Sequence, residues 1–288
     1  MKRKLFLLAA LFAISLAPTI SAAQGVSLAS GFTDFTTWSL YGSATVTNQT
    51  PGNGFTYSTM YLTQGIGGEA GAGFAPAAIA LDYNQAFTFD FHFGIPPSAG
   101  VRGDGLTFTL AGAPGVGFGG SDLGYGGLGS DSVAFAIDTF DFGAPDPVSP
   151  SVQILEGGSV TPLASTETGL GDSVRDPNFQ WYAHVDYTPS GLNNNAGMLT
   201  GTIEHLNLGT FSVSAAVDFA ALSMAGNPVY YGFTAGNGLA TDGHYISSAV
   251  PVPEPETWAM LLVGVGLVGF RLRGARMIAK LPARCSAL

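Results

Sequence analysis

The sequence predicts an all-β protein, a sandwich of two antiparallel sheets, and three observations carry this prediction. Segments such as 86–93 and 105–110 alternate large apolar residues with small or polar ones, which places one set of side chains on a single face of a strand. Glycine and proline separate these segments, as expected for turns. No window between residues 24 and 250 combines helical periodicity with capping residues. Strands without intervening helices favour two sheets packed face to face.

Eight strands are expected in order along one body, residues 24–250. They occupy residues 86–93, 105–110, 132–140, 151–155, 181–187, 198–205, 210–215 and 229–235. A body of this length suits a single sandwich, since β-sandwiches of roughly 200–250 residues form one domain. The glycine-rich stretch 112–129 contains Phe118 and Tyr125 among other apolar residues, so we expect an ordered loop there rather than a flexible linker.

A secretory signal peptide is expected at residues 1–23. Lys2-Arg3-Lys4 forms a positive region, residues 5–16 are apolar, and Ser21-Ala22-Ala23 provides a small-residue cleavage site. The mature chain is expected to start near Gln24. A buried N-terminal strand is the alternative, but three consecutive cations before an apolar run disfavour it.

The C-terminal tail has the layout of a sorting signal. It begins with Val252-Pro253-Glu254-Pro255-Glu256-Thr257-Trp258, continues as an apolar run to residue 270, and ends in Arg271, Arg273 and Arg276. The prolines end the preceding fold, and the basic cluster opposes passage across a bilayer. A hydrophobic helix over 257–270 is shorter than the roughly 20 residues that a comfortable membrane span needs.

Residues 251–276 closely resemble the PEP-CTERM sorting signal of Gram-negative bacteria. This resemblance implies export, transient insertion of the helix into the inner membrane, and recognition and cleavage by an exosortase. The final location is then the cell surface or the extracellular space. Residues 277–288 extend past the point where members of the family usually stop. A plain C-terminal membrane anchor remains the alternative.

The body is strongly acidic once both signals are set aside. Of the twenty acidic residues only Glu254 and Glu256 lie after residue 250, and the only cations of 24–250 are Arg102 and Arg175, which leaves a formal charge of −16. Nucleic acid is excluded as a partner because phosphate binding needs clustered cations. Partners should be neutral or cationic. The single cysteine, Cys285, lies in the tail, so the body has no disulfide.

Several motifs of the body resemble, in order and spacing, those of the legume-type (L-type) lectins. They are Gly103-Asp104-Gly105 with the strand that follows, residues 119–125, residues 132–140, and Asp146-Pro147, followed by 181–187 and 230–238 with His244. The resemblance covers most of the body. It implies a concanavalin-like jelly-roll sandwich that binds carbohydrate in a shallow site beside paired metal ions.

A sugar site needs a fixed carboxylate to accept hydroxyl bonds, backbone N–H groups to donate, and an apolar face for the C–H surface. We expect Asp104 to supply the carboxylate and Gly120 to bring backbone amides close, because glycine has no side chain in the way. Phe140, or alternatively Tyr125, is expected to supply the apolar platform.

The resemblance also implies a calcium ion that fixes the loops without touching the sugar. The matching ligands are Asp138, Asp146 and the carbonyl of Phe140. The family's glutamate and histidine are replaced here by Ala136 and Ser151. We therefore expect at most one Ca²⁺ and the loss of the second, transition-metal site, which needs carboxylate and imidazole ligands.

One further departure concerns an asparagine that in this family contacts both calcium and sugar. It is replaced by Phe142, in a turn that is shorter by a residue than in many family members. Asp141 is a hard oxygen ligand beside that position, so we expect it to compensate as a sugar-binding residue if the shortened turn shifts in register.

An enzyme is not expected. Related sandwiches that hydrolyse glycosides use a Glu-x-Asp-x-x-Glu strand, and here Ala136 and Asp141 stand at the two glutamate positions. The sequence therefore predicts an exported, surface- or matrix-associated carbohydrate-binding protein with a glycan or exopolysaccharide as partner. The alternative is a non-catalytic structural protein of the extracellular matrix whose sugar site has decayed.

Overall fold

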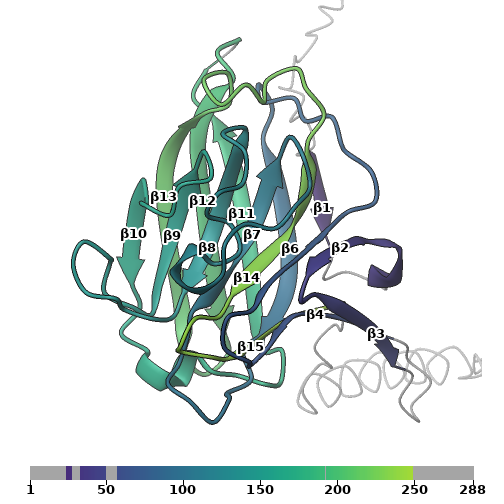
Figure 1. Ribbon diagram of the computed structural model, residues 1–288. Helices are drawn as coiled ribbons and strands as arrows, with labels where there is room; N and C mark the ends of the chain where they lie inside the picture. Colours follow the sequence, from purple (N-terminus) through teal and green to yellow (C-terminus); the bar gives the residue numbers. More distant parts are fainter. Residues whose placement is uncertain (1–23, 28–32, 50–56, 192, 249–288) are drawn as a thin grey trace, which may run out of the picture.

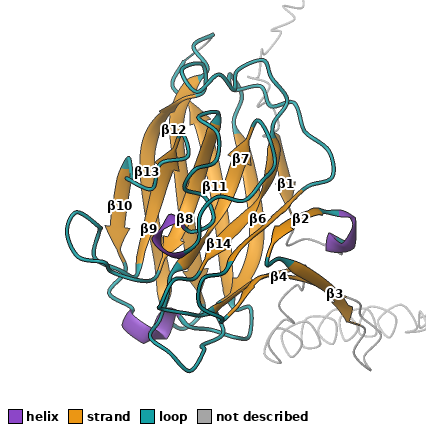
Figure 2. Cartoon of the chain, viewed as in Figure 1, coloured by secondary structure: helices purple, strands orange, loops and turns teal. Residues whose placement is uncertain are grey.

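The structure, a computed structural model, describes residues 24–27, 33–49, 57–191 and 193–248. These residues form two stacked β-sheets with very little helix (Figures 1 and 2). The predicted signal peptide 1–23, the predicted hydrophobic helix 257–270 and the extension 277–288 lie outside the described residues. In the part of the chain that is described, no helix is long and apolar enough to cross a membrane.

The larger sheet has eight strands in the order β13-β12-β11-β6-β15-β4-β3, with β1 beside β6. Its strands are β1 (Gln24–Ser27), β3 (Thr45–Gln49), β4 (Tyr57–Gln64), β6 (Phe87–Gly94), β11 (Trp181–Pro189), β12 (Ala196–His205), β13 (Gly209–Asp218) and β15 (Gly243–Ser247). The second sheet has seven strands in the order β10-β9-β8-β7-β14-β5-β2. Its strands are β2 (Ser39–Gly42), β5 (Ala70–Phe74), β7 (Gly105–Ala111), β8 (Ser132–Asp138), β9 (Ser151–Glu156), β10 (Ala164–Glu167) and β14 (Tyr230–Gly236).

The all-β prediction and the eight predicted strands are confirmed as β6, β7, β8, β9 and β11 to β14. The remaining strands were not predicted. Three of them, β2, β3 and β10, lie at sheet edges with mostly exposed or half-buried side chains and carry little apolar alternation. The pairing is antiparallel except that β1 runs parallel to β6. Three short 3₁₀ turns, η1 (Phe35–Thr37), η2 (Gly120–Asp122) and η3 (Gly171–Val174), join strands.

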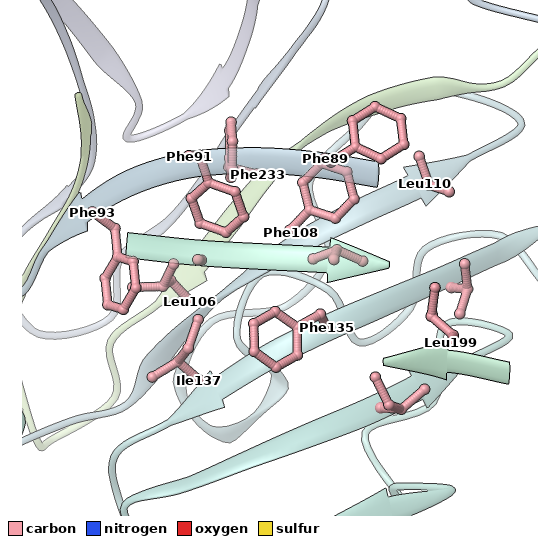
Figure 3. Packing of buried hydrophobic residues seen from close by; sticks show 14 of the residues in the cluster. Phe89, Phe91, Phe93, Leu106, Phe108, Leu110, Phe135, Ile137, Leu199 and Phe233 are labelled. Carbon is pink, nitrogen blue, oxygen red and sulfur yellow. The ribbon is translucent and has the colours of Figure 1, made fainter. Parts of the chain in front are cut away.

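The core lies between the sheets and is rich in phenylalanine (Figure 3). Alternate residues of β6 point inward from the larger sheet, and β7 and β8 face them from the smaller one; the residues are Phe89, Phe91, Phe93, Leu106, Phe108, Leu110, Phe135 and Ile137. The ring of Phe108 lies 4.9 Å from that of Phe89 and 5.8 Å from that of Phe91. Such aromatic pairs add to the stabilisation that comes from burial itself.

The glycine-rich stretch 112–129 is an ordered loop, as predicted. It closes on itself through backbone hydrogen bonds from Gly117 to Gly124 (2.7 Å) and from Phe118 to Gly126 (2.9 Å). Leu123 and Tyr125 from this loop pack in a second small core over the outer side of β8 and β9. Strands β7 and β8 are therefore buried on both faces, which gives a rigid base for the loops at their ends.

Candidate carbohydrate site

The candidate site lies at one end of the seven-stranded sheet, where three neighbouring strands begin or end. Gly105 at the start of β7 pairs with Asp138 at the end of β8 and with Gly236 at the end of β14. Asp104 directly precedes β7, and Gly238 follows β14 by two residues. Sheet register thus brings together predicted site residues that are far apart in the sequence.

Asp104 is the most constrained group of the site. Its side chain is 1% exposed, and its Oδ2 accepts a hydrogen bond from the backbone N–H of Gly238. Its Oδ1 is buried and has no hydrogen-bond partner. Burial raises the pKa of Asp104 to about 6, although the bond from Gly238 acts in the opposite direction. An acceptor left in this state costs free energy, on the order of 1–3 kcal/mol.

Two glycines line Asp104. Gly120, at φ +65°, lies close enough that an added Cβ would be 3.8 Å from Asp104 Oδ2, and a Cβ added to Gly238 would be 3.1 Å from the same atom. Gly120 thus lies beside the carboxylate, and its positive φ is a backbone conformation that favours glycine. Sequence reasoning missed Gly238 as a donor. The sequence feature that could have indicated this role is the Gly-Asn-Gly turn directly after a predicted strand.

Phe140 lies against the turn that carries Asp104, because a Cβ added to Gly103 would be 3.2 Å from Phe140 Cβ. The ring of Phe140 packs edge-on against Phe142, with centroids 4.6 Å apart, and Phe142 is 55% exposed. An apolar surface therefore borders the site. The alternative platform, Tyr125, is wrong: it is fully buried, with its hydroxyl 3.1 Å from the Ser132 hydroxyl.

Asp138 and Asp146 form an acidic pair next to this surface. Asp138 Oδ1 accepts from the N–H of Phe140 (3.1 Å), and Asp146 Oδ2 accepts from the N–H of Phe142 (2.9 Å). Burial raises the pKa of Asp138 to about 7, and the negative charge of Asp146 adds to this shift. A neighbouring negative charge raises the pKa of a carboxyl group because it disfavours the charged form.

Asp141 lies in the same turn and raises the pKa of Asp146, for which burial is the larger cause. Its Oδ1 accepts from the N–H of Gly143 (2.6 Å), so the carboxylate closes its own turn at the exposed surface. No group of three or more His, Cys, Asp or Glu side chains within the described residues is arranged to hold a metal ion.

Gln153 is a site residue that sequence reasoning missed. Its side-chain nitrogen donates to Asp138 Oδ2 (2.8 Å) and to the hydroxyl of Ser151 (3.0 Å). Ala136, which pairs with Gln153 across β8 and β9, is fully buried. The available signal was a glutamine between the apolar residues Val152 and Ile154 of a predicted strand.

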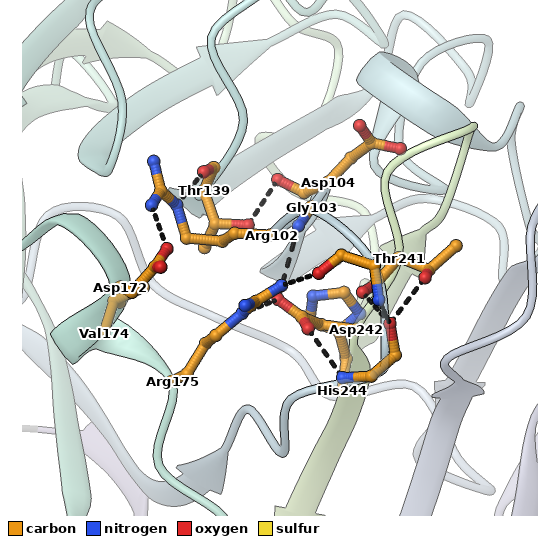
Figure 4. A network of polar contacts seen from close by, with 12 residues as sticks. Arg102, Gly103, Asp104, Thr139, Asp172, Val174, Arg175, Thr241, Asp242 and His244 are labelled. Carbon is orange, nitrogen blue, oxygen red and sulfur yellow. Dashed lines mark hydrogen bonds and ion pairs between the residues drawn. The ribbon is translucent and has the colours of Figure 1, made fainter.

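Both arginines of the body lie at this end and hold the turn before β7 (Figure 4). Arg175 pairs with the fully buried Asp242 (3.0 Å), and the same carboxylate accepts from the N–H of Gly103 (3.3 Å). Arg102 pairs with the exposed Asp172 (2.7 Å). Neither guanidinium is free to attract an anion, because each is engaged in an ion pair.

Comparison with solved structures finds the same fold in plant lectins. A lectin from Bauhinia forficata in complex with GalNAc has a TM-score of 0.56 and 21% identity over 73% of this chain and 90% of that chain. Arcelin-5, a lectin-like defense protein from Phaseolus vulgaris, has a TM-score of 0.55 and 19% identity over 73% and 89%. The metal-free form of lectin I-B4 from Griffonia simplicifolia has a TM-score of 0.55 and 18% identity over 74% and 91%.

Sequence comparisons add one result at the C-terminus. Residues 251–276 match the model of the PEP-CTERM protein-sorting motif, as predicted. No curated protein sequence matches the chain. This motif is a sorting signal and indicates an exported protein. The chain thus joins a body with the concanavalin-like fold of the legume lectins to a C-terminal PEP-CTERM protein-sorting motif.

Proposed function

We propose that the body binds carbohydrate, with Asp104 as the central acceptor. The observation that carries this proposal is the buried Asp104 Oδ1 without a partner, which a sugar hydroxyl would satisfy by donating to it once the covering residues move aside. The N–H of Gly238 orients the carboxylate, and Gly120 and the apolar side of Phe140 lie beside it. Asp141 is the proposed further contact, at the exposed edge of the same turn.

The proposed ligand is an uncharged glycan, and an exopolysaccharide outside the cell is its natural source. The body carries a formal charge of −16, and its two arginines are both engaged in ion pairs. Acidic sugars such as uronates need a free cation or a bidentate arginine for recognition. Neutral hydroxyls need no such cation, because they can donate to the Asp104 carboxylate.

We propose further that at most one Ca²⁺ binds, held by Asp138, Asp146 and the carbonyl of Phe140. These are hard oxygen ligands, and the repulsion between the two carboxylates supports a cation there. When bound, the ion would fix the turn that carries Phe140 and would not touch the sugar. Ala136 and Ser151 leave the second, transition-metal site without its carboxylate and imidazole, so this chain does not fit that ion.

The C-terminal motif also supports a proposal about where the protein is delivered. The sorting motif supports cleavage by an exosortase after transient insertion of the hydrophobic segment into the inner membrane, with release to the surface or medium.

A non-enzymatic role is supported by the fold neighbours and by Ala136 at a glutamate position of the glycosidase pattern. A structural matrix protein remains the second candidate, because Phe142 replaces an asparagine that would contact both ion and sugar.

A glycan array tests the proposed function. The secreted protein with calcium present should bind neutral glycans, and Asp104→Ala should lose this binding, since a hydrogen bond to a charged acceptor is typically worth about 1.5–3 kcal/mol. The matched control is Glu167→Ala, which removes one negative charge from the exposed surface of β10. If wild-type protein binds no glycan with calcium present, the matrix-protein role is the better description.

A further inference from the structure

We propose that the side-chain amide of Gln153 takes the structural place of the second metal ion, so that the ends of β8 and β9 are tied together without a transition metal. The inference rests on the geometry of four buried residues: Ala136, Asp138, Ser151 and Gln153. It goes beyond the proposed sugar binding and does not depend on it.

The register of the two strands explains how one amide reaches both partners. Asp138 pairs with Ser151, and Ala136 pairs with Gln153, so Gln153 lies diagonally across from Asp138 on the same face of the sheet. Its Nε2 has two N–H groups. One is directed to Asp138 Oδ2 at 2.8 Å and the other to the Ser151 hydroxyl at 3.0 Å. Both donors are therefore used.

The residues beside this amide are small and buried. Ala136 and Ser151 are fully buried and Gln153 is 2% exposed. The small side chains on either side leave room for the long glutamine side chain. A cation entering here would meet two N–H groups, whose hydrogens carry partial positive charge, instead of lone pairs. The amide donors thus disfavour a metal ion at a place that also lacks its carboxylate and imidazole ligands.

This arrangement fixes Asp138 from both sides. Its Oδ2 is held by Gln153 and its Oδ1 by the N–H of Phe140. The turn that leads from Phe140 to Asp146 therefore starts from an oriented carboxylate before any ion binds. Gln153 is a positioning residue for this turn, because it acts on the loop through Asp138.

The test is thermal unfolding of the full secreted protein in EDTA, in MnCl₂ and in CaCl₂, together with elemental analysis after dialysis. Wild-type protein should hold no manganese, and MnCl₂ should leave its unfolding midpoint unchanged. Gln153→Glu replaces the donors with a carboxylate beside Asp138, so it should lower the midpoint in EDTA by roughly 5–10 °C. Manganese should then restore stability, because an ion bound only by the folded state raises the midpoint.

Two controls separate the proposed role from a general loss of stability. Gln85→Glu makes the same chemical change in the turn before β6 and should neither lose stability nor gain a response to manganese. Gln153→Met keeps the length but removes the donors, so it should lower the midpoint without gaining that response.

Stoichiometric manganese in the wild type, or a Gln153→Met variant as stable as wild type, overturns the proposal. If Gln153→Glu is not recovered folded, those two measurements still decide it. None of the readouts uses a glycan, so a failure of the sugar site would be recognised separately.

Discussion

Asp104 should lower the stability of the folded protein at neutral pH, and Asp104→Asn should reveal by how much. Burial raises the pKa of Asp104 from 3.8 to about 6. Between these values the folded state binds more protons than the unfolded state, so the stability contributed by this group falls as the pH rises. A shift of roughly two units at about 1.4 kcal/mol per unit corresponds to about 3 kcal/mol. The stability that protonated Asp104 contributes to the folded state is fully lost above pH 7.

The assay is urea unfolding of both proteins at intervals from pH 3 to pH 8, in EDTA so that no cation lowers the pKa of the acidic group. The difference in unfolding free energy, Asp104→Asn minus wild type, should increase by about 3 kcal/mol between pH 3 and pH 7.5. Comparing the pH dependence removes any constant effect of the amide on packing. Asp138 and Asp146 titrate in both proteins and largely cancel. Parallel pH profiles would show that Asp104 titrates normally, and the argument for an unsatisfied buried acceptor would fail.

Four further predictions follow from the same end of the sandwich and from the tail. Affinity for a neutral glycan, measured by calorimetry, should rise as the pH increases through about 6, because the ionised Asp104 is the better acceptor; affinity that falls over this range would contradict its role. Arg175→Ala should cost about 3–5 kcal/mol in urea unfolding, since it leaves the fully buried Asp242 without its cation; Arg102→Ala, which exposes an already solvated partner, is the control and should cost far less. Elemental analysis of dialysed protein should find one calcium that is absent from Asp138→Asn, and no calcium in the wild type would remove the proposed ion. Intact-mass analysis of protein from the outside of native cells should show a chain that ends near residues 254–257, and material that retains Arg276 would refute cleavage.

The part of the fold that could be predicted is the part in which burial alternates along the chain. The inward phenylalanines of β6 and the alternation in β7 follow from a period of two, and both strands lie where the sequence placed them. Strands β2, β3 and β10 are exposed or half-buried on both faces, so no hydrophobic pattern marks them. Strand β5 is short and consists of alanine and glycine before Phe74, which resembles a turn in composition.

The residues of the candidate site also fall into those that the sequence could predict and those that it could not. Asp104 and Gly120 could be predicted as candidates because local motifs carry them. Gly238, Gln153 and Arg175 were missed because their roles are contacts across the sheet or between loops, to Asp104, Asp138 and Asp242 respectively, and such pairs become visible only when register is known.

The distribution of charge favours a binding site over a decayed one. Four carboxyl groups at this end of the sheet, Asp104, Asp138, Asp146 and Asp242, have pKa values raised by burial. Asp242 is paired with an arginine, whereas Asp104 retains an unpartnered oxygen. In a purely structural protein this acceptor lowers stability and an amide or alcohol would pack there at less cost. In a sugar-binding protein the same oxygen is an acceptor for a hydroxyl donor, once the residues that cover it move aside. The free-energy cost of burying an unpaired oxygen at Asp104 is therefore the reason to place the proposed ligand there.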